Sequence, residues 1–141
     1  EGYFPEKSFQ TVSREDIESY MNSTYEYYLG AQLPVIEAHL VRLINGENAP
    51  LHIIKRMVED IRLSIINAMG SDKKTDYTAS DEYYQGAISL IDDVKNLIIK
   101  HISGRYDKNM CYALLFFLSS FRKDLNHHLR IRSRVLIPMM K

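Results

Sequence analysis

The sequence contains little cysteine and no long hydrophobic run. Cys111 is the only cysteine among 141 residues, so an intramolecular disulfide is excluded and a reducing, cytoplasmic location is the simpler expectation. The longest apolar runs, such as ALLFFL at 113–118, fall far short of the about 20 residues that a helix needs to span a bilayer. We therefore expect no membrane association.

An excess of charge of one sign is also missing. Lys and Arg total 18 and Asp and Glu total 18, so the formal net charge is zero. The total charge therefore does not point toward nucleic acid or an anionic membrane. Basic residues cluster only near the C-terminus, and we interpret this cluster as a solvated helix face without direct nucleic-acid binding. Its members are Arg122, Lys123, Arg130, Arg132 and Arg134.

The motifs of common enzymes and metal sites are absent from the sequence. It has no HExxH, CxxC or EF-hand loop, no GxSxG and no glycine-rich phosphate loop. Cys111 has no evident histidine partner in the sequence. The chain is therefore not expected to be an enzyme.

Helical periodicity begins after residues 1–12, which we expect to form an extended N-terminal arm. Ser13 opens the stretch SRED, in which Asp16 stands three residues later, as in a capping box. Apolar and aromatic residues then recur at steps of three and four as far as a glycine stop at Gly46. Pro34 lies inside this pattern and is expected to kink the helix or break it near Leu33.

The second helix is expected to start near Pro50 and to stop at Gly70. The polar run SDKKTDYTA that follows is the clearest loop signal in the chain. We expect Ser80 to cap the third helix and Gly104 to end it.

Asp107 is expected to cap a fourth helix that ends around Pro138. No segment shows the period of two that is typical of strands. Long amphipathic helices with short connections favour antiparallel neighbours. The sequence therefore predicts an all-α chain in which residues 13–141 form an antiparallel, up-down-up-down four-helix bundle.

Three polar side chains lie on the faces that these helices are expected to bury. They are Tyr25 on the first helix, Tyr84 on the third and His128 on the fourth, whereas the second helix offers nothing comparable. A four-helix bundle can hold a metal where such side chains converge. The simpler interpretation is that the tyrosine rings and the imidazole pack in the core, each with a hydrogen-bond partner.

Arg132 stands one helical turn after His128, where a metal site would need a carboxylate. Arginine carries only donors and a fixed positive charge, so it cannot ligate a metal. Either Arg132 fills the space and charge of a cation, with tyrosine hydroxyls, Glu26 or another carboxylate as partners, or it extends outward along the surface. The sequence leaves both alternatives open.

Three stretches resemble the hemerythrin-like domains of bacteria, in particular the subgroup joined to helix-turn-helix transcriptional regulators. They are TYEYYLGAQLPVIEAHL at 24–40, ISLIDDVKNLIIKH at 88–101 and DLNHHLRIRSRVLIP at 124–138. The match covers three of the four expected helices, and its last stretch is the most specific.

The resemblance implies a degenerate metal site. The iron-binding histidines of the family fall on Tyr25 and Tyr84, its glutamate ligand falls on Arg132, and only His128 is retained. The second helix has IINAM at 65–69 where the family carries HxxxE. The resemblance therefore implies no bound cofactor, with iron as the alternative.

The leading hypothesis is a non-catalytic, metal-free sensory or interaction domain of a cytoplasmic transcriptional regulator. Its helix-turn-helix module would follow Lys141, and its signal would be a protein partner or a small molecule. One alternative is an iron-containing binder of oxygen or nitric oxide, or an iron-repair protein. Another is a helical bundle that holds a small ligand between its tyrosines. A homodimer is also left open, and apolar residues such as Met139 and Met140 could make the isolated domain dimerise artificially.

Overall fold

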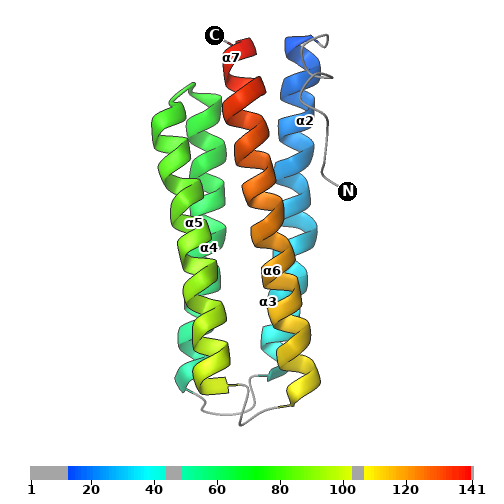
Figure 1. The fold of residues 1–141 in the computed structure, drawn as a ribbon, viewed down its shortest axis with the longest axis vertical. Helices are drawn as coiled ribbons and strands as arrows, with labels where there is room; N and C mark the ends of the chain where they lie inside the picture. The colour runs from blue at the N-terminus through cyan, green and yellow to red at the C-terminus, as the bar shows by residue number, and fades with distance from the viewer. Residues whose placement is uncertain (1–12, 44–48, 103–106, 141) are drawn as a thin grey trace.

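The computed structural model describes residues 13–43, 49–102 and 107–140. Within these ranges the chain forms helices and no strand, which confirms the predicted all-α class, and its four helical segments lie side by side along one axis (Figure 1). The first is α2 (Arg14–Tyr27), the π-helical turn η1 (Tyr28–Gln32) and α3 (Leu33–Leu43), and the second is α4 (Ala49–Lys73). The third is α5 (Tyr77–Leu97) with η2 (Ile98–Ile102), and the fourth is α6 (Lys108–Ile131), η3 (Arg132–Leu136) and α7 (Ile137–Met140).

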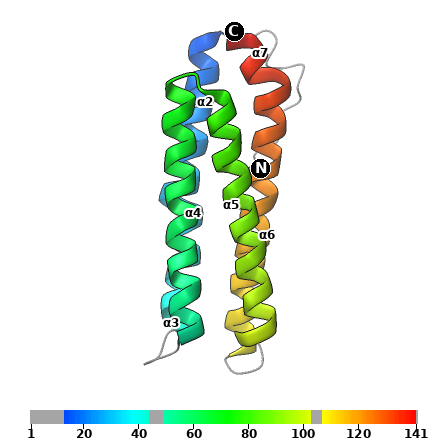
Figure 2. The same cartoon turned by 90° about the vertical axis from the view of Figure 1, so that its left-hand side faces the viewer.

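One end of the bundle gathers segments that are distant in sequence. The start of α2, the turn between α4 and α5, and the short helix α7 all lie at the upper end of the view in Figure 1. Figure 2 shows α4 and α5 side by side along their length, and these two helices make the most extensive helix–helix contact. On the other side of the bundle α3 packs against α6.

Two of the expected helix starts are confirmed. The Ser13 hydroxyl accepts a hydrogen bond from the Asp16 amide at 3.1 Å, and the Asp16 carboxylate accepts one from the Ser13 amide at 3.4 Å. At α6 the Asp107 carboxylate accepts bonds from two amides of the first turn. The expected arm at residues 1–12 and the expected stops at Gly46 and Gly104 lie outside the described residues.

The predicted boundaries between the second and third helices are wrong. The helix α4 does not stop at Gly70 but continues to Lys73, and α5 starts at Tyr77 with Asp76 rather than Ser80 as its cap. Ser80 is instead buried inside α5. The nine-residue polar run therefore contributes mostly helix, because tertiary contacts of its side chains outweigh its local loop signals.

A residue in the left-handed backbone conformation allows the connection between α4 and α5 to be as short as residues 74–76. Thr75 has φ of 59°, its amide donates to the carbonyl of Asp72, and the next amide, of Asp76, donates to the carbonyl of Ser71. This pair of bonds is the Schellman arrangement, which usually has glycine at the left-handed position. A β-branched residue is strained there, since its Cβ crowds the backbone.

The first and last segments stay helical across their prolines because a wide turn precedes each one. The turn η1 ends two residues before Pro34, and η3 ends two residues before Pro138. At η1 the Leu33 amide donates to the Tyr28 carbonyl five residues back. A wide turn of this kind accommodates a proline, which lacks an amide hydrogen and crowds the carbonyl four residues back. The expected break near Leu33 is thus replaced by a π-helical turn.

The inward faces of all four segments form one hydrophobic core. In the described part of the chain, no helix is both long enough and apolar enough to cross a membrane. Among the largest fully buried side chains are Tyr28, Tyr84, Phe121 and, unexpectedly for a core, Arg132. The polar surroundings of this arginine decide what the upper end of the bundle can do.

We predict that two separate substitutions near the connection between α4 and α5 each stabilise the protein. Gly70→Ala should raise the free energy of unfolding by about 0.5–1 kcal/mol, because Gly70 lies within a helix and an added Cβ there meets nothing within 4 Å. Thr75→Gly should raise it by about 1 kcal/mol by relieving the left-handed strain. Urea denaturation measures both changes, with Gly86→Ala in α5 as the matched control for Gly70→Ala. Destabilisation by Gly70→Ala would show that α4 ends at Gly70 after all.

Candidate functional site

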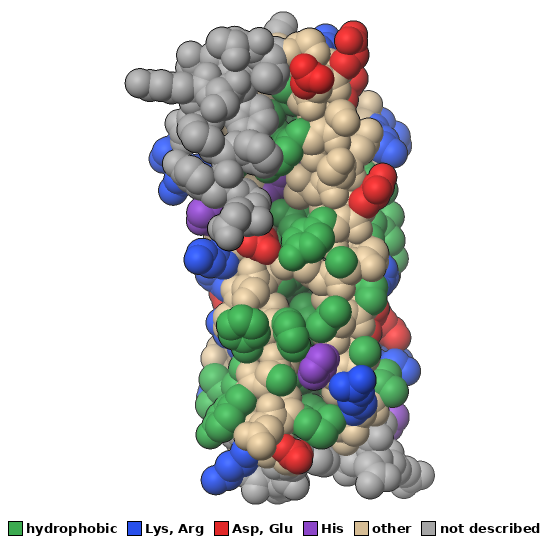
Figure 3. Space-filling view, turned by 90° about the vertical axis from the view of Figure 1, so that its right-hand side faces the viewer, with side chains coloured by type: hydrophobic (Ala, Val, Ile, Leu, Met, Phe, Trp, Pro, Cys, Tyr) green, Lys and Arg blue, Asp and Glu red, His purple; other side chains and the backbone are tan. Residues whose placement is uncertain are grey.

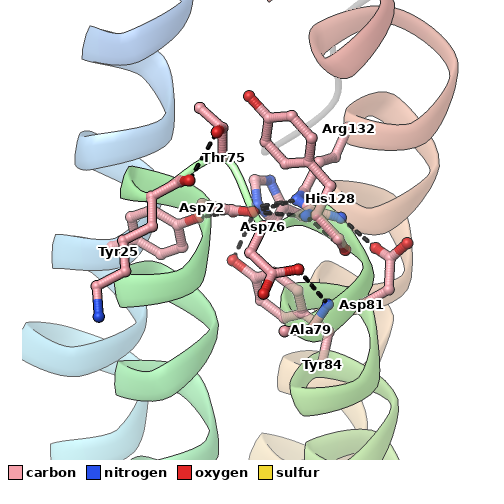
Figure 4. A network of polar contacts seen from close by, with 11 residues as sticks. Tyr25, Asp72, Thr75, Asp76, Ala79, Asp81, Tyr84, His128 and Arg132 are labelled. Carbon is pink, nitrogen blue, oxygen red and sulfur yellow. Dashed lines mark hydrogen bonds and ion pairs between the residues drawn. The ribbon is translucent and has the colours of Figure 1, made fainter.

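Arg132 lies in the interior of the bundle, with none of its surface exposed. It is the first residue of η3, and its side chain points toward the ends of α4 and α5 (Figure 4). Of the two alternatives that the sequence left open, the inward orientation is therefore correct. The basic cluster accordingly loses this member, and Arg122 pairs with Asp92 at 2.7 Å.

Two aspartates hold the guanidinium of Arg132. Its Nη2 donates to Oδ1 of Asp72 at 2.5 Å, and its Nε lies 3.2 and 3.1 Å from the two carboxylate oxygens of the same residue. Its Nη1 donates to the carboxylate of Asp81, whose side chain is half exposed. The Tyr77 carbonyl lies 3.5 Å from Nη2. The arginine thus joins η3 to α4 and α5 at once.

The charge of Arg132 survives burial because of these partners. Burial alone would lower the pKa of the guanidinium, but its hydrogen bonds and ion pairs with Asp72 and Asp81 outweigh that effect and raise the pKa. A charge removed from water costs several kcal/mol, which only well-placed partners offset. Removal of one member of the Arg132–Asp72 pair is therefore expected to leave the other charge buried without a partner and to destabilise the fold.

Tyrosine rings complete the surroundings of the guanidinium. Its central carbon lies 5.4 Å from the ring centroid of Tyr84 and 5.7 Å from that of Tyr77, within the range of cation–π attraction. The Tyr25 hydroxyl donates to Oδ2 of Asp72 from the opposite side (Figure 4). Burial, followed by the charge of Asp72, raises the pKa of Tyr25, so this phenol stays protonated.

His128 lies one turn below Arg132 and is almost completely buried. Its Nε2 is 3.3 Å from the Tyr84 hydroxyl, and four tyrosine rings lie against its imidazole with centroids between 5.5 and 6.2 Å away, from Tyr20, Tyr25, Tyr28 and Tyr84. Burial and the nearby Arg132 charge lower the pKa of His128 to about 4. The imidazole is therefore neutral at physiological pH.

The structure brings Tyr25, Tyr84, His128 and Arg132 together, and it adds two aspartates that the sequence analysis did not single out. The statement that the second helix offers no inward polar residue is wrong, because Asp72 of α4 is 6% exposed. A signal was present, since the apolar steps of α4 at Ile61, Ile65 and Ala68 lead on to position 72. Because the second helix was expected to stop at Gly70, position 72 was not assigned to its inward face. Glu26, considered as a partner for Arg132, lies at an exposed position.

These residues do not fit an iron centre. Both oxygens of Asp72 are already bonded to the guanidinium, and Arg132 places a fixed positive charge where the ion would lie. The described residues contain no group of three or more His, Cys, Asp or Glu side chains close enough to hold a metal. One neutral imidazole and two protonated phenols remain, which is a poor ligand set for iron.

An open cleft adjoins the site on its α2 side. It has a volume of about 400 Å³ and lies between α2 and the turn that joins α4 to α5. Its buried lining comes from Met21, Tyr25 and Asp72, while Arg14 and Lys73 are among its exposed residues. The cleft therefore gives solvent molecules and solutes access to the edge of the buried network.

A comparison of the chain with protein-family models, with curated proteins and with solved structures finds no match in any of the three.

We predict that Arg132 contributes far more to the free energy of unfolding than a partly exposed arginine in an ion pair does. Arg132→Met should lower the free energy of unfolding by about 3–5 kcal/mol, because it leaves Asp72 buried without its cation. Arg122→Met breaks a pair whose side chains are 36% and 42% exposed and should cost at most about 1 kcal/mol. Urea denaturation compares the two variants. Equal losses would contradict the assignment of Arg132 as a buried cation.

A double variant keeps this test informative if the single one does not fold. Arg132→Met combined with Asp72→Leu removes both charges and should recover most of the lost stability, because apolar pairs often replace buried ion pairs without loss. A double variant no more stable than Arg132→Met alone would mean that the charge left on Asp72 is not the cause of the loss.

We also predict that His128 makes the protein less stable in mild acid. Its pKa is about 4 in the folded chain and about 6.5 in the unfolded chain, so the unfolded chain binds more protons between these values. Stability should fall as the pH drops from about 6.5 to 4, by on the order of 3 kcal/mol in total. His128→Phe should remove this slope, whereas His52→Gln at an exposed position should keep it. Urea denaturation at several pH values measures the slopes, and parallel slopes for wild type and His128→Phe would refute the prediction.

Proposed function

We propose that this chain is a metal-free, hemerythrin-like, antiparallel up-down-up-down bundle that acts as a non-catalytic sensory or interaction domain. The observation that carries the proposal is the buried guanidinium of Arg132, held by Asp72 among Tyr25, Tyr84 and His128. By the resemblance, the iron ligands of that family fall on Tyr25, Tyr84, His128 and Arg132, and only His128 keeps the ligand's residue type.

The arginine takes over the electrostatic role of a metal ion in this proposal. A metal centre places positive charge between helices and thereby holds anionic side chains from several of them. Arg132 supplies one positive charge and donates to carboxylates from both α4 and α5. Its planar group with five donors suits this bridging better than the point charge of a lysine would.

Sensing would act through the same contacts. The network connects α2 through Tyr25, α4 through Asp72 and α5 through Asp81 to η3 in the last segment. A small molecule in the adjoining cleft, or a partner protein, that binds one arrangement of these contacts better than another shifts the packing of the last segment. In our proposal that segment leads to a helix-turn-helix module after Lys141, and the protein works in the cytoplasm.

The first test is the metal content of protein produced with an iron supplement. We expect far less than one iron per chain by elemental analysis and no visible charge-transfer band. Arg132→Glu should gain cobalt(II) binding, because it puts a third carboxylate beside Asp72 and Asp81 in place of the cation. Arg122→Glu makes the same charge change at a partly exposed site and should gain none.

About one iron per wild-type chain with a tyrosinate absorption band would overturn the metal-free proposal. Cobalt bound equally by both glutamate variants would contradict the role given to Arg132. The proposed link to a DNA-binding module has a separate test, namely the reading frame beyond Lys141. A frame that encodes no such module would refute this part of the proposal.

A further inference from the structure

An apolar face lies on the side of the bundle formed by α2, η1, α3 and α6. Two stretches without any charged residue lie there, YYLGAQLPVI at 27–36 and MCYALLFFLSSF at 110–121. Tyr27 is 53% exposed and Phe116 is 66% exposed. Figure 3 shows hydrophobic side chains gathered over the middle of the side on which these helices lie. Contiguous apolar surface of this kind marks interaction sites.

The face is shaped as a groove between protruding aromatic side chains. The groove has a volume of about 300 Å³ and is lined by Tyr27, Ala31, Gln32, Val35, Phe116, Phe117, Ser120 and Asp124. Its small residues Ala31 and Ser120 leave room between the helices. Tyr27 comes from α2 and Phe116 from α6, so the face offers both protrusions and a depression to receive them.

The charges near this groove differ between its two ends. Asp124 lines it close to Gln32, whose amide donates to the Asp124 carboxylate at 2.8 Å. Arg42 is exposed seven residues beyond Val35, hence on the same side of α3 about 10 Å further along the helix. A two-fold axis that runs across the helices at the groove therefore brings the acidic end of one copy toward the basic end of the other. The zero net charge of the chain removes long-range repulsion between copies.

We propose that this face is the contact surface of a homodimer, in which a second copy of the chain packs its own α2–α6 face into the groove around a two-fold axis. Such an interface is isologous, since the same patch serves both partners. It also has the usual composition of an interface centre, rich in Tyr and Phe and poor in charge.

The size of the face indicates a weak, reversible dimer. The exposed parts of Tyr27, Tyr112 and Phe116, at 53%, 60% and 66%, amount to roughly 300–400 Å² if an aromatic side chain offers about 150–250 Å². A stable interface buries about 800 Å² per partner. The association is therefore expected to depend on protein concentration and to be reversed by one well-placed charge. It does not depend on the function proposed above.

Sedimentation equilibrium of the full chain at concentrations up to about 1 mM tests the proposal, since even weak specific association registers there. We expect wild type to move from monomer to dimer as concentration rises. Phe116→Lys on α6 and Ala31→Arg on η1 should each weaken the association at least tenfold. Leu63→Lys places the same charge on an apolar side chain that is 56% exposed on α4, and it should leave the association unchanged.

Circular dichroism verifies that each variant keeps the helical content of wild type. A wild-type chain that stays monomeric at the highest concentration overturns the proposal and leaves the face for a different partner. Dissociation by Leu63→Lys but not by Phe116→Lys also overturns it, since the contact would then lie on the α4–α5 side. Equal weakening by all three variants would mean unspecific charge repulsion and would count against it too.

Discussion

The upper end of the bundle is organised by the need to neutralise one buried guanidinium. Removing a charge from water costs several kcal/mol, so Arg132 can be buried only where carboxylates meet it. Asp72 reaches it because α4 continues past Gly70, and Asp81 reaches it because α5 starts as early as Tyr77. The connection between these helices must then be very short, which leaves Thr75 in a left-handed conformation that suits glycine better. The short connection that places both carboxylates near Arg132 is therefore also the one that strains Thr75.

Much of the fold could be predicted from the sequence, because the apolar steps of three and four identify the inward face of each helix. The same steps placed Tyr25, Tyr84 and His128 in the interior, where the structure has them. The boundaries around Gly70 could not be predicted from local signals. Glycine and a polar run usually end a helix, but here the pairing of Asp72 with a residue 60 positions away outweighs them. The orientation of Arg132 depends on the same pairing with Asp72, so it could not be predicted from the residues next to Arg132 in the sequence.

The local conflicts of this chain are concentrated around the buried network. A glycine inside α4, a β-branched residue at the left-handed turn position, a half-exposed aspartate and a buried arginine all lie within or next to it. Natural sequences tend to depart from local rules at sites that serve a purpose other than folding. The aromatic groove lies further along the bundle on α2, η1, α3 and α6, and it adjoins the network through Tyr28, whose hydroxyl donates to the carbonyl of the groove residue Asp124 and whose ring lies against His128.

The wide turns in the first and last segments have a consequence for any alignment with other bundles. A π-helical turn is in effect a single extra residue that the helix absorbs without forming a loop. In the last segment both Ile131 and Arg132 are buried, and so are Val135 and Leu136, adjacent pairs that a regular helix would point apart. The inward register before η3 thus differs by one position from the register after it. An alignment with a relative that lacks the extra residue therefore needs a gap in the middle of a helix, a place where alignments conventionally put none.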